Sequence, residues 1–268
     1  MNLDNKVVAI TGASSGIGKA LTLDALQRGA KVAVCARSMA KLQGIYGDRE
    51  NLLLVAADVS KKEDCERFIA AATERFGGVD VLINNAGNSM RALFADADVK
   101  VLEELMAVNF WGTVYTTKAA LPSIIQRKGT VVGVSSIAGY RGLPGRTGYS
   151  ASKFAMQGFL EALRTELLYE KVNVMWVAPG FTASNIRNTA LAADGNPQKE
   201  TPLNESKLMT AEECASRILN GIEKGKRTIV MTTQGKLTVL LNKLMPKMLD
   251  KIVFSHFEKE PDSPLKRK

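Results

Sequence analysis

Short, almost continuously apolar runs alternate with longer segments of helical periodicity along this chain. The runs lie at residues 6–10, 31–36, 51–57, 79–84, 129–136, 172–178 and 227–231. The helical segments open near Gly16 and then cover about 38–45, 60–76, 98–126, 149–169 and 210–224. Strands that are apolar throughout are covered on both faces, which is typical of parallel sheets whose strands are joined by right-handed helical crossovers. The alternation therefore predicts one α/β domain: a doubly wound parallel sheet of about seven strands with helices on both faces.

Composition and local sequence exclude several classes of protein. The chain has 268 residues, of which 46% are hydrophobic and 24% charged, as in ordinary globular proteins. No uncharged apolar run approaches the roughly 18–20 residues that cross a bilayer, and the first residues lack the pattern of a signal peptide. The three cysteines, Cys35, Cys65 and Cys214, are far apart and predict reduced thiols in a cytoplasmic protein.

A single histidine, His256, stands close to the end of the chain. Nucleophiles activated by histidine and metal sites built from several histidines are therefore not expected, and we predict no bound metal. The net charge of +9 comes from Lys and Arg residues that are spread along the chain without interleaved aromatic residues. Because a basic balance alone does not identify a nucleic-acid-binding protein, we predict no nucleic-acid partner.

A glycine-rich loop, TGASSGIGKA (11–20), follows the first apolar run directly. Gly12 allows a tight turn, whereas Gly16 and Gly18 let the backbone approach a pyrophosphate and let the next helix pack against the strand. The free N–H groups and the dipole at the start of that helix favour an anion. No P-loop Lys-Ser/Thr follows, so the loop predicts a dinucleotide in a Rossmann-type fold.

The end of the second apolar run predicts which dinucleotide binds. Folds that prefer NAD usually place an acid here for the ribose hydroxyls, but this chain has Ala36 followed by Arg37. A guanidinium pairs with a 2′-phosphate, which an acid would repel. We therefore expect NADP(H), although Arg37 could instead be a solvated loop residue.

Taken together, the motifs match a known family. The sequence resembles the classical short-chain dehydrogenases/reductases over about residues 5–232. The matching motifs stand in the family's order and spacing: TGASSGIG (11–18), DV (58–59), NNAG (84–87), VNFWG (108–112), VSSIAG (134–139), YSASK (149–153) and PG (179–180). The resemblance implies an NADP(H)-dependent oxidoreductase that reversibly reduces a ketone or aldehyde to an alcohol by hydride transfer.

The resemblance also implies roles for four polar residues. Tyr149 would be the acid/base that protonates the carbonyl oxygen or takes the hydroxyl proton in reverse. Lys153, one helical turn later, would lower the phenol's pKa from its usual value near 10 and would hold the nicotinamide ribose. Ser136, with Ser135 as the adjacent candidate, would orient the substrate oxygen, although it could merely cap a loop. Asn109 would hold a water in the proton relay, or it could be a buried polar residue of its helix.

A larger set of residues is implied in cofactor contacts. It comprises the glycine loop, the ends of several strands and the catalytic pair: Gly12, Ser14, Ser15, Gly16, Ile17, Gly18, Arg37, Asp58, Val59, Asn85, Ala86, Gly87, Tyr149, Lys153, Pro179, Gly180, Thr182 and Ser184. Thr182 and Ser184 depart from the aliphatic residue and the threonine that are usual in the family. Both side chains remain small, so we still expect them at the nicotinamide end.

The segment 181–209, between the sixth strand and the next helix, is expected to cover the substrate, as long segments at this place often do. Its composition is mixed and largely polar and identifies no ligand. Met90, Tyr140, Leu143 and Phe181 are candidates for the pocket wall, although each could equally be ordinary packing. We expect a small-molecule carbonyl compound or alcohol as the substrate.

The segment 236–268 departs from the alternation and is predicted to be a basic helical extension of the domain 1–235. Between residues 236 and 252, apolar residues cover one half of a helix and four lysines gather on one flank. Pro246 should kink this helix or divide it in two. The helix could contact an anionic membrane surface peripherally, pack across a subunit interface or cover the substrate cleft. The membrane or cleft alternative would suit a lipid-like or steroid-like ketone.

Two functions remain open at this point. One is the reductase described above, and the other is a non-catalytic NADP(H)-binding sensor or scaffold protein. The complete set of four polar residues favours the enzyme, because a protein that only binds the dinucleotide does not need all four. The resemblance also implies a homodimer or homotetramer, formed through the helices around 98–126 and 149–169.

Overall fold

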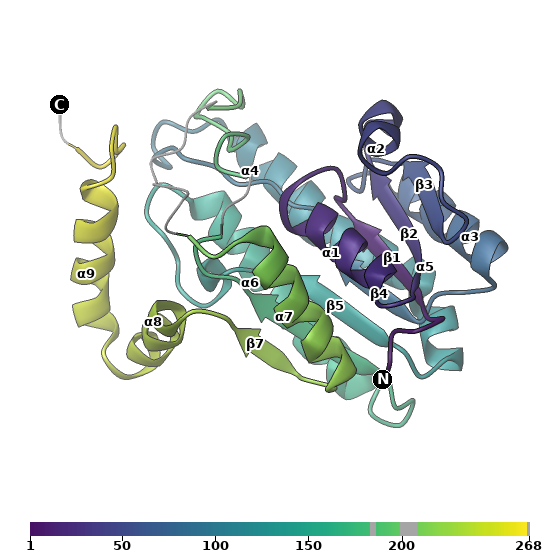
Figure 1. The fold of residues 1–268 in the computed structure, drawn as a ribbon. Coiled ribbons are helices and arrows are strands. Elements are labelled where there is room, and N and C mark those ends of the chain that lie inside the picture. The colour runs from purple at the N-terminus through teal and green to yellow at the C-terminus, as the bar shows by residue number, and fades with distance from the viewer. Residues whose placement is uncertain (183–185, 199–207, 267–268) are drawn as a thin grey trace.

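Seven parallel strands form one sheet at the centre of the protein, as Figure 1 shows for the computed structural model. The structure describes residues 1–182, 186–198 and 208–266. The strand order is β3-β2-β1-β4-β5-β6-β7, and every neighbouring pair is parallel. The predicted doubly wound sheet of about seven strands is therefore confirmed.

Each strand lies within its predicted apolar run or ends one residue beyond it. The strands are β1 (Val7–Thr11), β2 (Lys31–Ala36), β3 (Leu52–Ala56), β4 (Val81–Asn84), β5 (Thr130–Val134), β6 (Asn173–Ala178) and β7 (Thr228–Val230). All residues of β1, β4 and β5 are buried, because helices cover both faces of the sheet. Burial on both faces explains why these runs are apolar throughout rather than alternating.

Two helical layers build two hydrophobic cores, one on each face of the sheet. One layer consists of α1 (Gly16–Gln27), α2 (Met39–Tyr46) and α7 (Ala211–Glu223). The other consists of α3 (Lys62–Phe76), α5 (Gly112–Gln126) and α6 (Thr147–Glu166). Within β1, Val8 and Ile10 face the first core and Ala9 faces the second. The strand thus divides its side chains between two apolar environments, as expected for a doubly wound fold.

The long helical region predicted at 98–126 is one continuous helical stretch with an irregular centre. It runs through α4 (Val99–Leu105), a π-helical segment (Met106–Trp111) and α5. π-Helical turns are rare and frequently occur at functional sites. The buried Asn109 lies within this segment.

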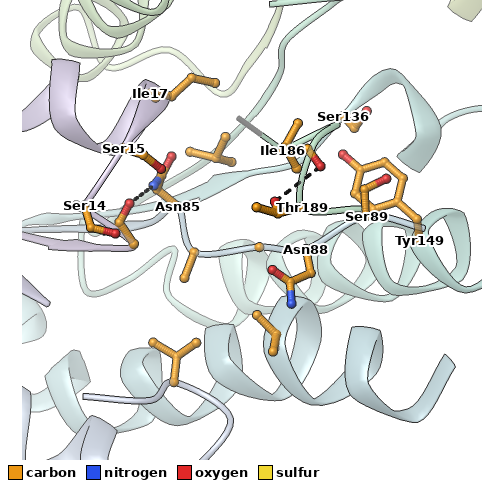
Figure 2. A pocket seen from close by; sticks show the side chains of 18 of the residues that line it. Ser14, Ser15, Ile17, Asn85, Asn88, Ser89, Ser136, Tyr149, Ile186 and Thr189 are labelled. Carbon is orange, nitrogen blue, oxygen red and sulfur yellow. Dashed lines mark hydrogen bonds between the residues drawn. The ribbon is translucent and has the colours of Figure 1, made fainter. Parts of the chain in front are cut away.

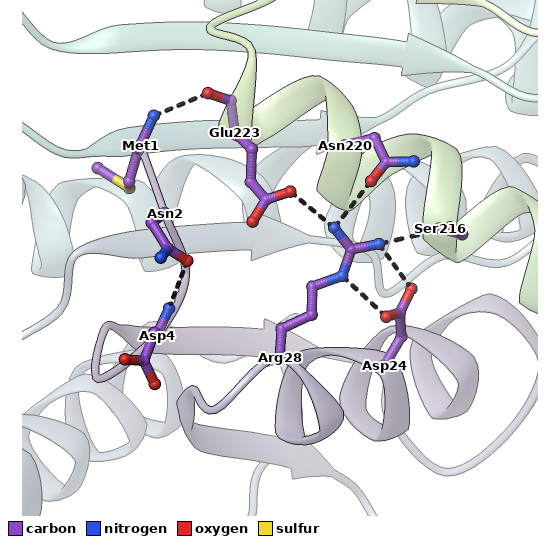
Figure 3. A network of polar contacts seen from close by, with 8 residues as sticks. All are labelled: Met1, Asn2, Asp4, Asp24, Arg28, Ser216, Asn220 and Glu223. Atoms are coloured by element: carbon purple, nitrogen blue, oxygen red, sulfur yellow. Dashed lines mark hydrogen bonds and ion pairs between the residues drawn. The ribbon is translucent and has the colours of Figure 1, made fainter.

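An ion-pair network ties the end of α1 to α7, as Figure 3 shows. The Arg28 guanidinium donates to the carboxylate of Asp24 on its own helix and to the carboxylate of Glu223 on α7, each at 2.8 Å. The same guanidinium donates to Asn220 Oδ1 at 2.8 Å. Charge-assisted hydrogen bonds of this kind are roughly twice as strong as neutral ones, so the network holds α1 in place behind the glycine loop.

Two helices follow β7, and they meet where the proline predicts a break. Helix α8 (Thr233–Leu244) ends two residues before Pro246, and α9 (Pro246–Glu258) begins at it. The predicted division of the helix at Pro246 is confirmed, whereas a domain boundary at residue 235 remains a prediction. Among the described residues, no helix is both long and apolar enough to cross a bilayer.

Candidate active site

A cavity of about 560 Å³ lies at the carboxyl ends of the central strands, beside the point where the strand order reverses between β1 and β4. Open α/β sheets bind ligands in such a crevice. All the predicted cofactor contacts line this cavity except Ser184, which lies outside the described residues. Figure 2 shows Ser14, Ser15 and Ile17 on one side of the cavity and Ser136, Ser89 and Tyr149 on the other.

The glycine loop makes room for a ligand by bringing backbone close to backbone. Gly12 has a φ of +70°, and a Cβ there would lie 2.7 Å from Ala86 Cα. A Cβ at Gly18 would lie 2.2 Å from the carbonyl oxygen of Gly12. Ser15, just before α1, is extended and forms no side-chain cap in the described structure. The N–H groups of the first turn of α1 can therefore bind a phosphate, and the loop fits a dinucleotide.

Hydrogen bonds hold the loop after β4 beside the glycine loop. Thr11 Oγ1 accepts hydrogen bonds from the backbone N–H groups of Asn85 and Ala86, both at 3.0 Å. Asn85 Nδ2 donates to the carbonyl oxygens of Thr11 and Gly12 at 2.9 and 3.2 Å. These bonds fix the two walls of the crevice relative to each other.

Two exposed cations line the cavity at the end of β2. Arg37 follows Ala36, and Lys41 stands four residues later, in the first turn of α2. Asp58 also lines this end, but its Oδ1 accepts from the N–H and the hydroxyl of Ser60 at 3.0 and 2.8 Å. Arg37 was predicted from the sequence and Lys41 was not, because Arg37 precedes the helix that carries Lys41 and no helical spacing relates the two residues.

Helix α6 carries Tyr149 and Lys153 one turn apart, with Lys153 Nζ 5.8 Å from the centre of the Tyr149 ring. The ammonium donates to the carbonyl oxygen of Val134 at 2.9 Å. Ser135 Oγ accepts from Gln157 Nε2 at 2.8 Å, whereas Ser136 lies beside the Tyr149 phenol, as Figure 2 shows, and lowers the pKa of that phenol. The geometry therefore favours Ser136 over Ser135 as the hydroxyl that faces a substrate.

The expected effect of Lys153 on the phenol requires a correction. The pKa of Tyr149 is raised, because burial of the phenol outweighs the groups that lower it. Those groups are the Ser136 side chain and the charges of Arg146 and Arg187. Lys153 is itself desolvated, which lowers its pKa to about 8, and its ammonium bonds a backbone carbonyl rather than the phenol.

Asn109 lies beneath the cavity rather than in its wall. Its Oδ1 accepts from the N–H of Asn88 at 2.9 Å, and its Nδ2 donates to the carbonyl oxygen of Asn88 and to Ser152 Oγ. A Cβ at Gly87 would lie 3.0 Å from Asn109 Oδ1 and 3.4 Å from Lys153 Nζ. Asn109 therefore holds the loop that carries Gly87, and its place in a proton relay remains a prediction.

Two of the four predicted pocket residues line the cavity and two do not. Leu143 and Phe181 line it. Met90 is fully buried in a separate cluster, and its sulfur accepts from the N–H of Gly148 at 3.3 Å. The hydroxyl of Tyr140 accepts from the Trp176 indole at 2.8 Å, behind the wall. Met90 and Tyr140 do not line this cavity, and their contact with a substrate remains a prediction.

Sequence reasoning missed several lining residues at the substrate end, among them Ser89, Arg146, Ile186 and Arg187. Arg146 stands three residues before Tyr149, just before α6 begins, and this closeness in sequence could have indicated it. Ser89 is set by the path of the loop after β4, for which the sequence gives no clear signal. Residues 183–185 and 199–207 of the expected covering segment lie outside the described residues.

Comparisons with known proteins agree with this geometry. The sequence profile of the family described as short chain dehydrogenase matches residues 6–195. The protein 11-beta-hydroxysteroid dehydrogenase-like 4A of Arabidopsis thaliana is 36% identical over 254 residues, which cover 92% of this chain and 83% of that protein.

Solved structures share the fold. A short chain dehydrogenase from Burkholderia cenocepacia in complex with NADP has a TM-score of 0.80 at 24% identity, covering 94% of this chain and 99% of that one. A short chain dehydrogenase/reductase from Burkholderia phymatum in complex with NAD has a TM-score of 0.82 at 22% identity, covering 93% and 96%. At these identities the likeness concerns the fold, and the bound dinucleotides differ.

We expect the Lys153 amine to titrate near pH 8. Burial lowers its pKa to about 8, because the charged form is poorly solvated there, whereas an unperturbed lysine titrates near 10.4. NMR of protein labelled at lysine Cε should show one signal with this midpoint. The signal should vanish in Lys153→Met and persist in Lys62→Met, whose side chain is 61% exposed. A midpoint above pH 10 for the Lys153 signal would contradict the expectation.

Proposed function

The chain belongs to the short-chain dehydrogenase family, and from that premise we propose that it is an NADP(H)-dependent oxidoreductase that interconverts a ketone or aldehyde and the corresponding alcohol. One observation carries the proposal. The glycine loop and the Ser136–Tyr149–Lys153 group line the same cavity, so a dinucleotide on the loop would reach the side chains that handle the proton.

The proposed division of labour follows from this arrangement. The nicotinamide, when bound, supplies or accepts the hydride. Ser136 donates a hydrogen bond to the substrate oxygen, and the Tyr149 hydroxyl gives that oxygen its proton during reduction. Lys153 holds its ammonium between β5 and the cavity, where it can reach a ribose hydroxyl. Asn109 supports the loop that carries Gly87 beside this ammonium.

The direction of the Tyr149 pKa shift suits the reductive half of this chemistry. A raised pKa keeps the phenol protonated at neutral pH, and reduction needs a proton donor. Alcohol oxidation needs the phenolate, and the positive charges of Arg146 and Arg187 favour that form. Tyr149 can therefore act as the acid in reduction, and the positive charges beside it help it to act as the base in alcohol oxidation.

We infer NADP(H) rather than NAD(H) from the charges at the end of β2. Arg37 and Lys41 line the cavity there, and Ala36 stands where an acid would bind ribose hydroxyls. Two cations favour a 2′-phosphate, and the guanidinium can contact it through two parallel hydrogen bonds.

We further propose a hydrophobic carbonyl substrate. Leu143, Phe181 and Ile186 give the substrate end an apolar wall, and the Arabidopsis relative is described as 11-beta-hydroxysteroid dehydrogenase-like. A lipid-like or steroid-like ketone fits such a wall, because burial of its apolar surface contributes roughly 25 cal/mol per Å².

Peripheral membrane contact through the segment 236–252 is part of the proposal. Leu240, Leu244, Met248 and Ile252 are exposed on α8 and α9, and lysines flank them. An exposed apolar stripe with basic flanks binds anionic lipid surfaces.

We propose a cytoplasmic location for the protein. Its three cysteines are free and buried, and thiols stay reduced in the cytoplasm.

We also propose a homodimer or homotetramer formed through the helices of the 98–126 and 149–169 regions. Trp111, between α4 and α5, and Phe154, on α6, are both exposed although they are large and apolar. Aromatic residues of this kind are enriched in protein interfaces.

Replacing Tyr149 by Phe should abolish turnover and leave cofactor binding intact. The hydroxyl supplies the proton, and general acid catalysis contributes roughly 10²–10⁴-fold to a rate. We expect kcat to fall by about 10³-fold, and the NADPH Kd, measured by fluorescence, to change by less than about threefold. Tyr169→Phe, at a side chain that is 97% exposed, is the matched control. Retained turnover in Tyr149→Phe would refute the mechanism.

Replacing Arg37 by Asp should change the cofactor preference. Loss of a charge-assisted contact costs about 1.5–3 kcal/mol, so the NADPH Kd should rise by about 100-fold while the NADH Kd changes little. Titrations of both dinucleotides against the variant measure this. Arg227→Asp is the control, because Arg227 is exposed and lies just before β7, at the end of the sheet away from the cavity. An equal loss for both dinucleotides would show that Arg37 does not select the 2′-phosphate.

Flotation with vesicles tests the membrane contact. The wild-type chain should float with vesicles that contain about one third phosphatidylserine and should do so less at high salt, because lysine contacts are screened. Met248→Glu with Ile252→Glu should abolish flotation, since both side chains are exposed on α9. Leu168→Glu, at another exposed apolar residue, should not. Equal flotation of all three proteins would exclude this surface.

A further inference from the structure

Three cavity residues at the substrate end are held from outside by α9 and the turn that follows it. Leu143 packs against the cluster of Leu249, Val253 and Phe257. The Phe181 ring stacks on His256 with ring centres 6.1 Å apart. The Arg146 guanidinium lies over the Phe257 ring at 4.4 Å. The helix therefore backs the wall of the substrate site.

A buried ion-pair cluster around Glu260 adds to these contacts. Its side chain is only 4% exposed and accepts from Arg146 Nη2 at 3.2 and 3.1 Å, one distance to each carboxylate oxygen. A second guanidinium, that of Arg91, has its Nε 3.5 Å from the same carboxylate and also bonds the carbonyl oxygen of Pro261. Removing one partner of a buried pair is costly, because it leaves an uncompensated charge.

Arg146 connects this cluster to the reacting group. It lines the cavity, stands three residues before Tyr149 and lowers the pKa of the Tyr149 phenol by its charge. The other charged groups that face the phenol are Arg187 and Lys153. The charges of Glu260 and Arg91 and the titratable phenol of Tyr149 face Arg146. Hydrogen bonds thus join the turn after α9, through the Glu260 carboxylate, to the Arg146 guanidinium, which shares the cavity with the Tyr149 phenol and acts on it by its charge.

We propose that Glu260 is a positioning residue of the active site, which through Arg146 keeps a positive charge beside the Tyr149 phenol. Docking of α9 and its following turn thereby becomes a condition for proton transfer. The proposal rests on the function proposed above, in which Tyr149 exchanges the proton. It extends that function by making a residue more than 100 positions away in sequence part of the acid/base machinery.

The alternative is that Glu260 merely screens Arg146, and the two accounts predict opposite signs. If Glu260 holds Arg146 in place, loss of the carboxylate lets the guanidinium leave the phenol, and the phenolate becomes harder to form. If Glu260 only screens a guanidinium that stays, its loss exposes the phenol to more positive charge and makes the phenolate easier to form. The direction of the Tyr149 titration therefore separates the accounts.

The experiment is an ultraviolet difference titration of Tyr149, in which each variant is compared with the same variant that also carries Tyr149→Phe. Arg146→Met should raise the midpoint by about one pH unit, and Glu260→Gln should raise it by at least half as much. The double variant should show no larger shift than Arg146→Met alone, because both act through one guanidinium. Glu260→Asp, which keeps the carboxylate, should stay within about 0.3 units of the wild type.

Arg91→Met is the matched control. It removes the other buried guanidinium that faces Glu260, but Arg91 is not a lining residue of the cavity. We expect its midpoint to stay within about 0.3 units of the wild type. An equal shift in Arg91→Met would reduce the effect to general destabilisation and would overturn the proposal. An unchanged or lowered midpoint in Glu260→Gln would overturn it as well.

A second variant covers the case in which Glu260→Gln does not fold. Arg146→Lys keeps the charge, but its side chain ends one atom short of the Nη2 position that bonds Glu260, so the charge is held less firmly and the midpoint should rise by about half a unit. No shift in Arg146→Lys would then overturn the proposal. The titration needs no substrate, so a wild-type chain that turns over no alcohol would count against the proposed function alone.

Discussion

The parallel pairing of β1 with β4 is the interaction on which the site depends. The two strands pair in register from Val8 with Val81 to Ile10 with Ile83, and the strand order reverses between them. Because all strands run the same way, their carboxyl ends meet at one edge, where the reversal leaves a crevice. At that edge, hydrogen bonds between Thr11 and Asn85 join the end of β1 to the loop after β4. The glycine loop and the loop after β4 therefore face each other before any ligand arrives.

A conflict between burial and charge governs the chemistry of this crevice. Burial raises the pKa of the Tyr149 phenol and lowers that of the Lys153 amine, so it disfavours the charged form of both. The charge that partly offsets burial at the phenol comes from Arg146 and Arg187. Arg146 is in turn fixed by Glu260, and the acid/base strength of the site thus depends on a segment that lies outside the sheet.

The sequence was sufficient for the sheet and for the close backbone approach of the glycine loop. Continuous apolar runs specify strands that are buried on both faces, and the glycine spacing specifies a close backbone approach, so both follow from local physics. The arrangement at the substrate end could not be predicted in the same way. Tertiary packing holds Met90 and Tyr140 in places where they do not line the cavity. The Tyr149–Lys153 spacing predicts proximity but not the desolvation that reverses the expected pKa shift.

Consumption of NADPH in the presence of a panel of ketones tests the central claim most directly. The panel should contain short-chain, long-chain and steroidal ketones, with absorbance at 340 nm followed at neutral pH. The account predicts that at least one apolar ketone is reduced with one NADPH consumed per alcohol formed. Tight NADPH binding without consumption of NADPH for any ketone of the panel would contradict the account and would identify a dinucleotide-binding protein without this activity.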